Sequence, residues 1–483
     1  MLKNWKNDFL SSVVVFLVAL PLCLGIALAS NAPLSAGLFA GIIGGVVVGA
    51  LSGSHVSVSG PAAGLTVIVV NGLAQLGSFE AFTLAVFLAG VFQFLFGLMK
   101  AGVIGNYFPT AVIKGMLAAI GLILITKQIP NVLGLPANWD FSHLLELMNS
   151  GILIISFSSV AIMLFWEKMS TRGLSFFKLV PGALVAVLFS ISLEFLYMAI
   201  FPGLNLDPSS LVHLPFHGGF QEIWSMVNFP SMERITDTAV IQVALTIAVV
   251  GSIETLLSVD AAEKIDPQKR PTSRNRELFA QGAGNMLSGF FGGLPITAVI
   301  VRTSANISAG SKTKLSAILH GLWILACIDL IPDLLNFIPL ASLACILLLT
   351  GYKLCKPYHF LEMSKRGVDQ LVIFCSTIIA ILATDLLKGI FVGILVALLF
   401  EIKKIKRRPF KVFTDEQKCE VEFLEYVSFL HKAELQKVLN EIPSGKKLIL
   451  KNMNGIKLHI DVQELILEKK RQLDKIDNIV TIT

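Results

Sequence analysis

Two apolar segments of this chain are each interrupted by glycine and proline where an unbroken helix would be expected. The first interruption, residues 57–64, reads SVSGPAAG, and the second, residues 292–302, reads GGLPITAVIVR. A segment inside a lipid bilayer must satisfy all of its backbone polar groups, so it unwinds only where protein or a watery cavity surrounds it. Paired interruptions in the two halves of one chain therefore predict a transporter with a binding site near the middle of the membrane.

The composition supports a membrane location. The chain has 483 residues, of which 54% are hydrophobic and 15% are charged, and its mean hydropathy is +0.75. Runs such as 13–28 and 152–166 contain no charged side chain, which is typical of multi-span membrane proteins. The first apolar run leads directly into a second one, so we expect a retained span rather than a signal peptide. The cysteines show no paired spacing, which argues against a disulfide framework or a metal site.

We predict about fourteen membrane spans from windows of about 20 apolar residues. With both termini in the cytoplasm, this count places nearly all Lys and Arg residues of the loops on the cytoplasmic side, as the positive-inside rule requires. The longest external loop, about 202–235, contains only Arg234. We therefore expect a multi-pass protein of the plasma (inner) membrane. The spans lie near residues 10–29, 34–52, 56–76, 81–99, 110–130, 150–166, 179–201, 237–260, 275–291, 295–309, 315–331, 336–352, 368–384 and 386–402.

The composition changes near residue 409, after a basic cluster of Lys403, Lys404, Lys406, Arg407 and Arg408. The pattern predicts strands at 421–430, 447–450 and 478–482, and helices at 431–439 and 461–472. We therefore predict two domains, a transmembrane domain of residues 1–408 and a cytoplasmic α/β domain of residues 409–483. About 70 residues make a marginal core, which favours support from a second copy or from the transporter itself.

Seven short motifs occur in an order that resembles the SulP family of anion transporters over nearly the whole chain. Each motif alone is a weak signal, but their order is specific. The tail resembles a shortened STAS domain, the cytoplasmic module of this family, without its final helix. The motifs are ALP at 19–21, VSGP at 58–61, GSIETLL at 251–257, NRELFAQG at 275–282, GGLP at 292–295, RTSAN at 302–306 and TDLLKGI at 384–390.

This resemblance implies an α-helical polytopic membrane protein with a 7+7 inverted repeat and half-helices in spans 3 and 10. It also implies a homodimer and an elevator-type movement of a core domain against a gate domain. A helix N-terminus carries unpaired N–H groups and about half a positive charge, so two such ends aimed at one point bind an anion. We predict that the anion contacts Gly60, Pro61, Ala62, Thr297, Val299, Ile300, Val301 and Arg302.

Two ionisable residues stand within apolar runs, where a charge is costly and marks a candidate site. The resemblance implies that Arg302 raises the positive potential at the anion; the alternative is an arginine that snorkels from a helix end. Glu254 is the only charged residue between 239 and 259. The resemblance implies that it binds the coupling Na⁺ or H⁺, and the alternative is a hydrogen bond to the backbone of the tenth span.

Other polar residues have less specific interpretations. The hydroxyls of Ser57, Ser59 and Thr297 could donate to an anion or satisfy unwound backbone. Beyond Glu254 we expect a solvated charge network rather than a metal site, made of Asp260, Glu263, Lys264, Asp266, Arg274 and Glu277. The net charge of +6 is explained by cytoplasmic loops and the tail, so no nucleic-acid partner is expected.

The sequence therefore predicts a secondary active transporter of a small inorganic anion, coupled to sodium or protons. Val299, Ile300 and Val301 stand where relatives often carry hydroxyls, and Leu22 where they often carry glutamine. Binding would then depend on backbone N–H groups and Arg302, which suits bicarbonate or sulfate. Resemblance to a bacterial subgroup associated with carbonic anhydrases favours bicarbonate slightly. A dicarboxylate or nucleobase carrier, an anion channel and a membrane sensor are the alternatives. Since the sequence shows no catalytic constellation, we expect no enzyme activity and no cofactor.

Overall fold

The structure is a computed structural model of the chain, and its described part divides into two compact units. The first unit consists of residues 1–102 and 120–355, and the second of residues 103–119 and 356–483. Each unit is considered by itself. The structure describes residues 4–482 except for 104–107, 136–147, 174–175, 178–179, 215–222, 225–226, 403–408, 416–417, 425, 441–446, 452–455, 457 and 474–479.

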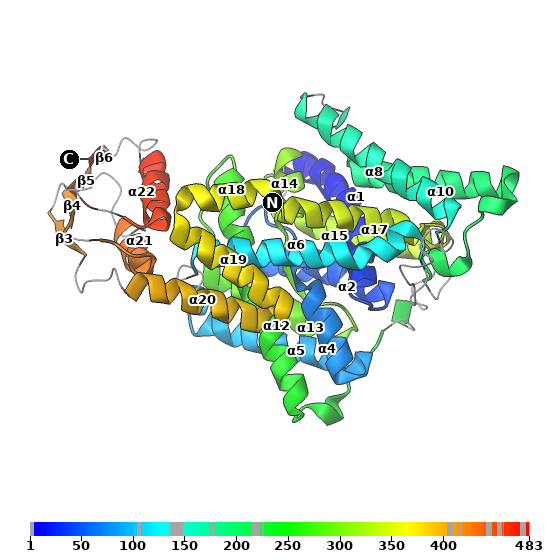
Figure 1. The fold of residues 1–483 in the computed structure, drawn as a ribbon, viewed down its shortest axis with the longest axis horizontal. Coiled ribbons are helices and arrows are strands. Elements are labelled where there is room, and N and C mark those ends of the chain that lie inside the picture. Colours follow the sequence, from blue (N-terminus) through cyan, green and yellow to red (C-terminus); the bar gives the residue numbers. More distant parts are fainter. Residues whose placement is uncertain are drawn as a thin grey trace. The chain divides into compact units, whose positions relative to one another are not determined.

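The first unit is built almost entirely of helices (Figure 1). A π-helical turn, Gly44–Val48, joins α2 to α3, and a 3-10 turn, Ala63–Leu65, precedes α4. Helix α6, Thr110–Leu133, begins in the second unit and ends in the first. The other helices are α1 Trp5–Ala29, α2 Leu34–Ile43, α3 Gly49–Leu51, α4 Thr66–Leu76, α5 Phe79–Leu98, α8 Ser150–Thr171, α10 Gly182–Ile200, α12 Thr238–Ile265, α13 Arg274–Phe290, α14 Ile300–Ser308, α15 Leu315–Leu330, α16 Pro332–Asn336 and α17 Leu340–Leu354.

Short polar side chains begin three of the long helices. Ser78 accepts a hydrogen bond from the Ala81 N–H at the start of α5, and Asn149 and Asp237 play the same part for α8 and α12. Such caps satisfy N–H groups that have no partner within the helix. The three helices therefore begin within two residues of the predicted starts of these segments.

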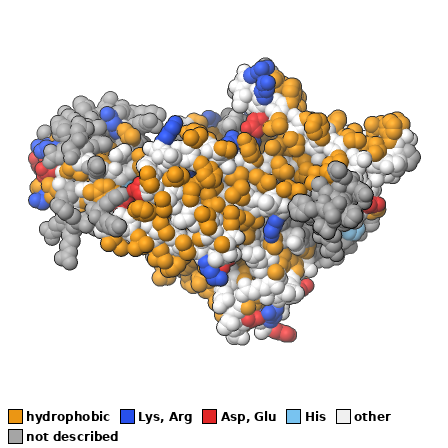
Figure 2. Space-filling model, in the orientation of Figure 1, with side chains coloured by type: hydrophobic (Ala, Val, Ile, Leu, Met, Phe, Trp, Pro, Cys, Tyr) orange, Lys and Arg blue, Asp and Glu red, His pale blue; other side chains and the backbone are white. Residues whose placement is uncertain are grey.

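The described residues contain eight helical stretches that are long and apolar enough to cross a membrane. Each predicted segment falls on a helix or on a strand followed by a helix, and Figure 2 shows hydrophobic side chains spread over much of one face of the helical part. The protein is a helical membrane protein, while the count of fourteen spans stays a prediction. The eight stretches are Trp5–Ala29, Leu34–Leu51, Phe79–Leu98, Thr110–Leu133, Ser150–Thr171, Gly182–Ile200, Thr238–Ile265 and Leu340–Arg366.

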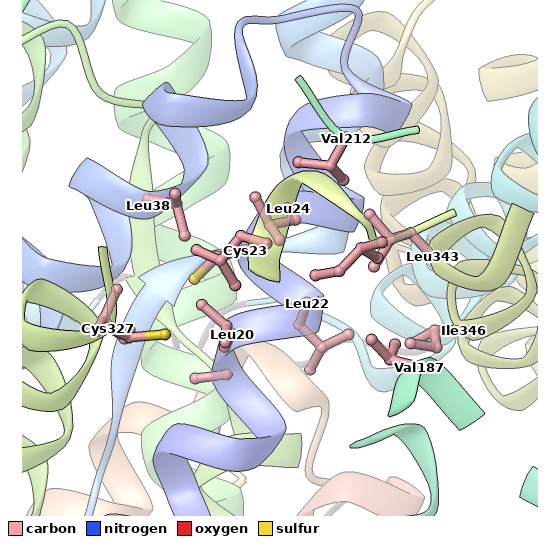
Figure 3. Close-up of a cluster of buried hydrophobic side chains, with 14 of the residues drawn as sticks. Leu20, Leu22, Cys23, Leu24, Leu38, Val187, Val212, Cys327, Leu343 and Ile346 are labelled. Carbon is pink, nitrogen blue, oxygen red and sulfur yellow. The ribbon is translucent and has the colours of Figure 1, made fainter. Parts of the chain in front are cut away.

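The centre of α1 lies in a cluster of buried apolar side chains (Figure 3). Lipid is as apolar as these side chains, so within a bilayer such a cluster stabilises the unit by close packing rather than by removal from water. The packing holds α1 firmly, and one of its residues, Cys23, reaches the breaks. Around Leu20, Leu22, Cys23 and Leu24 lie Leu38 of α2, Val187 of α10, Cys327 of α15, and Leu343 and Ile346 of α17.

The two breaks pair with each other. Strand β1, Ser59–Pro61, runs antiparallel to strand β2, Ile296–Ala298, so that Gly60 lies opposite Thr297 and Pro61 opposite Ile296. The first strand leads through the 3-10 turn into α4, and the second leads into α14. Each break is therefore extended backbone followed by a short helix. The backbone hydrogen-bond partner that each extended segment needs is the extended segment of the other break.

The second unit contains helices α18 Pro357–Arg366, α19 Val368–Ala383 and α20 Leu386–Ile402, followed by the tail. The tail has one sheet in the order β3-β4-β5-β6, in which β3 and β4 are antiparallel and the other neighbours are parallel. Alternate residues of β4 and β5, such as Val421, Phe423, Leu448 and Leu450, form its core with the helices. The tail elements are β3 Phe410–Thr414, β4 Lys418–Phe423, α21 Lys432–Asn440, β5 Lys447–Lys451, α22 Ile460–Leu473 and β6 Val480–Ile482.

The predicted alternation of strands and helices in the tail is confirmed, with two corrections. The prediction of a strand over 421–430 is wrong at both ends, because β4 begins at Lys418 and ends at Phe423. The chain turns at Ser428, whose hydroxyl accepts from the Leu430 N–H and starts a 3-10 turn. Strand β3 was not predicted. The basic cluster at 403–408 lies outside the described residues, and the predicted boundary at residue 408 falls inside the second unit.

Candidate functional site

Two helix N-termini emerge from the paired strands, and neither is capped by the side chain of its own N-cap residue. Ala62 precedes the 3-10 turn that opens α4, Val299 precedes α14, and neither side chain accepts a hydrogen bond from the first turn. The first N–H groups of a helix have no partner within it. Uncapped ends of this kind attract anions, because their N–H groups and the helix dipole both favour negative charge.

The Arg302 side chain lies across the first break and is fully buried. Its Nη2 donates to the Cys23 Sγ at 3.3 Å and to the Pro61 carbonyl at 3.4 Å. Its Nε and Nη1 have no hydrogen-bond partner among the described residues. Gly60 makes room for the guanidinium: a Cβ at Gly60 would lie 3.1 Å from Cζ and would overlap Nη1. A buried guanidinium needs hydrogen-bond acceptors and a counterion, and an anion would supply both to the unused donors of Arg302.

The Glu254 side chain meets the other side of the first break. A Cβ at Gly64 would lie 2.7 Å from its Oε2, and this oxygen has no hydrogen-bond partner among the described residues. The next residue of α12, Thr255, accepts a hydrogen bond from the Ala298 N–H of β2 at 3.3 Å. Helix α12 thus contacts both breaks. The structure brings the predicted residues Gly60, Pro61 and Arg302 together, and it places Glu254 against Gly64, four residues after Gly60.

The other predicted positions are less uniform. Ala62 and Thr297 are buried. The Thr297 hydroxyl donates to the Ala298 carbonyl at 3.4 Å, so of the two predicted roles, donation to an anion or to unwound backbone, it has the second in this structure. Val299 and Ile300 are partly exposed. Val301 is 51% exposed while Arg302 is buried, so these neighbours point to different sides of α14. Only Arg302 of this pair lies against Gly60.

Several residues at the breaks were missed by the sequence analysis. The Thr303 hydroxyl accepts from the Val58 N–H at 3.1 Å, and Asn306 donates to the Val56 carbonyl at 2.9 Å. Gln281 donates to the Ser59 hydroxyl at 2.8 Å, so Ser59 braces the break. These side chains satisfy unwound backbone, which is the requirement that identified the breaks in the first place. The sequence signal for them was the presence of polar side chains in α13 and α14, the helices on either side of the second break.

One prediction about charges is wrong. Glu277 and Asp266 were grouped with a solvated network, but both are buried. Asp266 pairs with Arg270 at 2.8 Å. Glu277 accepts from the Ser52 hydroxyl at 2.6 Å and from the Gly53 N–H at 3.0 Å. The Glu277 carboxylate anchors the chain before β1, because it accepts hydrogen bonds from donors in the unwound loop. Asp260 pairs with Arg274 at 2.7 Å, and no cluster of three metal-ligating side chains occurs in the part of the chain that the structure describes.

The amino-acid sequence of the chain is similar to those of known transport proteins. Residues 5–379 match the model of the sulfate permease family. The bicarbonate transporter BicA of Picosynechococcus sp. is 28% identical over 425 residues, which cover 83% of this chain and 71% of that protein. YvdB of Bacillus subtilis, whose name assigns it provisionally to sulfate transport, is 29% identical over 416 residues, which cover 84% of this chain and 75% of YvdB.

Solved structures share the fold. The transmembrane domain of a cyanobacterial BicA matches with a TM-score of 0.69 at 24% identity, covering 82% of this chain and 98% of that domain. SLC26A9 matches with a TM-score of 0.72 at 16% identity, covering 100% of this chain and 85% of that chain. The matched relatives are transporters, which confirms the prediction of a transporter rather than an enzyme. Since the family model matches most of its length, the chain belongs to the sulfate permease family.

Proposed function

We propose that this protein is a secondary active transporter of bicarbonate or sulfate and that the anion binds between the two breaks. The observation that carries the proposal is the buried Arg302 guanidinium, whose Nε and Nη1 have no partner among the described residues and which lies beside two uncapped helix N-termini. A charge in this position would be costly without a counterion. An anion supplies the counterion and also accepts from the free N–H groups.

Glu254 is the proposed site of cation coupling. Its Oε2 has no partner among the described residues, and its carboxylate faces Gly64 next to the helix that the anion would touch. A Na⁺ or H⁺ at this carboxylate would neutralise it and favour the simultaneous presence of an anion nearby. The reciprocal effect follows by linkage, since each ligand changes the affinity of the other by the same factor.

Few side chains at the proposed site could distinguish bicarbonate from sulfate. The Thr297 hydroxyl is directed to a backbone carbonyl, so the anion would be held by N–H groups and by Arg302, together with contacts at Ala62, Val299 and Ile300. Bicarbonate and sulfate both have several acceptor oxygens that suit such donors. The relatives are named for both ions. We therefore include both in the proposal, with bicarbonate first.

The remaining parts of the proposal concern assembly and movement. We propose fourteen spans in two inverted repeats, both termini in the cytoplasm of a plasma (inner) membrane protein, and a core that moves against a gate in an elevator manner. We also propose a homodimer and a cytoplasmic regulatory tail of the STAS type. The support is the distribution of Lys and Arg in the loops and the pairing of one break from each half of the chain.

The test is uptake of labelled bicarbonate and of labelled sulfate into proteoliposomes that contain the purified protein. Each anion is offered with and without a sodium gradient and with and without a pH gradient. The proposal predicts saturable uptake of one or both anions that depends on one of the gradients. Flux that does not saturate and ignores both gradients would indicate a channel, and uptake of a nucleobase or dicarboxylate in place of both anions would indicate a different carrier.

A further inference from the structure

We infer that Asn285 and Gln93 are positioning residues for the anion site, because they hold the free edge of β2 and thereby the start of α14 with Arg302. This inference rests on the proposed function, since it concerns how the same site keeps its shape. Asn285 lies on α13 and Gln93 on α5, and both are fully buried. Neither residue contacts Arg302 through any of its hydrogen bonds to described residues.

Strand β2 has a strand neighbour on one side only, so the backbone groups of its other edge need different partners. Asn285 supplies both partners for Ile296. The Ile296 N–H donates to the Asn285 Oδ1 at 2.6 Å, and the Asn285 Nδ2 donates to the Ile296 carbonyl at 3.0 Å. Two residues further on, the Ala298 N–H donates to the Thr255 hydroxyl at 3.3 Å. Side chains of α13 and α12 therefore take the place of a third strand.

Gln93 accepts a hydrogen bond from the Asn285 amide, whose orientation Ile296 determines. The Ile296 N–H can only donate, so the Asn285 oxygen must face it, and the Asn285 Nδ2 is then directed to the Gln93 Oε1 at 2.6 Å. The Gln93 Nε2 in turn donates to the Ala248 carbonyl and the Ser252 hydroxyl of α12, each at 3.4 Å. Because Ser252 is two residues before Glu254, the relay connects the helix of the proposed cation site to the strand that leads to Arg302.

Close packing of α5 against α13 makes this relay possible. A Cβ at Gly282 would lie 2.5 Å from the Phe94 nitrogen and 2.8 Å from the Gly90 carbonyl oxygen, and a Cβ at Gly90 would lie 2.7 Å from the Gly282 carbonyl oxygen. Backbone atoms cannot move aside as side-chain ends can, so only glycine allows this approach. The approach brings Gln93, one turn from Gly90, within hydrogen-bond distance of Asn285.

The test compares Asn285→Ala, Gln93→Ala and the double variant with the wild type in proteoliposome uptake. Only monodisperse protein is used, and rates are normalised to the amount reconstituted. Loss of the two-point contact should raise the KM for the transported anion about tenfold in Asn285→Ala, equivalent to about 1.4 kcal/mol, and less in Gln93→Ala. Since Gln93 acts through Asn285, the double variant should have the KM of Asn285→Ala rather than the product of both effects.

Asn336 offers a matched control, because it makes the same two-point contact with a backbone residue elsewhere. Its Oδ1 accepts from the Leu214 N–H at 2.7 Å and its Nδ2 donates to the Leu214 carbonyl at 3.4 Å. Asn336→Ala should leave the KM unchanged even if it lowers the melting temperature. A KM in Asn285→Ala that equals the wild-type value, or an increase that Asn336→Ala matches, would overturn the inference.

Two further outcomes keep the inference separate from the proposed function. If Asn285→Ala does not fold, Asn285→Asp replaces it, since this variant keeps the acceptor for the Ile296 N–H but loses the donor. Asn285→Asp should still raise the KM, and a wild-type KM would overturn the inference.

If the wild type transports neither anion, the proposed function fails. If the wild type transports and the variants have its KM, only the positioning role fails.

Discussion

Two glycines determine where the two ionisable side chains lie. The space at Gly60 is occupied by the Arg302 guanidinium, and the space at Gly64 by the Glu254 carboxylate. In both cases the neighbouring atoms are the ends of flexible side chains rather than backbone. A methyl group at either position would therefore displace a charge without breaking a helix, which separates effects on transport from effects on folding.

Gly60→Ala should raise the KM for the anion while the melting temperature stays near that of the wild type. The added methyl would move the guanidinium away from the first break, and a hydrogen bond to a charged group contributes about 1.5–3 kcal/mol. Concentration-dependent uptake and detergent melting curves measure the two quantities. Gly203→Ala is the control, because a Cβ there meets no atom within 4 Å. Equal KM values for both variants would show that Arg302 need not lie over Gly60.

Glu254→Gln should leave anion binding in place and abolish the dependence of uptake on sodium or protons. The amide keeps the shape of the carboxyl group but carries no charge and does not titrate, so a coupling cation has nothing to bind. The measurement is anion uptake with and without each gradient. Glu233→Gln, at an exposed position, removes the same charge outside the spans and should keep the dependence. If Glu254→Gln also keeps it, the carboxylate has a structural role.

Some residues of the candidate site could be predicted from the sequence, and others could not. Arg302 and Glu254 could be predicted because a charge within an apolar run is rare, and Gly60 because it lies in a break. Cys23 could not, since it reads as an ordinary core residue and its contact with Arg302 spans 279 residues of sequence. The partners of Asn285 depend on the packing of α5 against α13, which no local pattern reveals.

At the scale of elements, α5 and α13 pack closely against each other, and α13 also contacts β2 of the second break. Gly90 and Gly97 of α5 lie two turns apart, as do Gly282 and Gly289 of α13. A Cβ at Gly289 would lie 2.6 Å from the Thr83 carbonyl oxygen, and one at Gly97 would lie 2.8 Å from the Phe279 nitrogen. Small residues on both helices allow backbones to approach, which is how membrane helices associate without a hydrophobic driving force.

Gly282→Ala should destabilise the protein by about 1–3 kcal/mol, as overpacking of a tight contact does. The inserted methyl would meet the Gly90 carbonyl oxygen at 2.8 Å, and neither helix can yield without disturbing the Gln93–Asn285 contact. The melting temperature in detergent measures the effect. Gly25→Ala in α1 is the control, because its nearest neighbour would be a Leu347 side-chain atom at 3.4 Å. Similar melting temperatures for the two variants would contradict the close packing.

The elements themselves were largely predictable. Long apolar runs indicated the helices, and Gly-Pro interruptions indicated the extended segments, because both signals are local. The pairing of β1 with β2 could not be read from either segment, since the partners lie in opposite halves of the chain. In the tail, the end of β4 was misplaced because residues 424–430 continue its alternation although Ser428 starts a turn.

At the scale of the whole molecule, the tail takes part in the structure of membrane helices within the second unit. Asp461, at the start of α22, accepts from the Thr110 N–H at 3.2 Å and from its hydroxyl at 2.7 Å, and so caps α6. Tyr426 donates to Glu401 of α20 at 3.2 Å. Burial and the Glu401 carboxylate raise the pKa of the Tyr426 hydroxyl above its usual range, so it remains a donor at all physiological pH values.

Deletion of residues 409–483 should lower expression and dimer content while leaving the ratio of bicarbonate to sulfate uptake unchanged. The truncated chain loses the cap of α6 and the partner of Glu401, whereas all residues of the proposed site precede residue 409. Asp461→Ala in the full chain removes the cap alone and should cost about 1 kcal/mol of stability. Size-exclusion chromatography and paired uptake assays measure these effects. A changed anion ratio in the truncated protein would contradict the separation of tail and site.

The central claim, that Arg302 binds the transported anion at the paired breaks, is tested most directly by the uptake kinetics of Arg302→Ala. Arg172→Ala, which removes the same charge from an exposed position, is the control and should transport like the wild type. Loss of a charged hydrogen bond worth about 1.5–3 kcal/mol should raise the KM of Arg302→Ala roughly 10- to 100-fold. A folded Arg302→Ala protein with the KM and maximal rate of the wild type would contradict the claim.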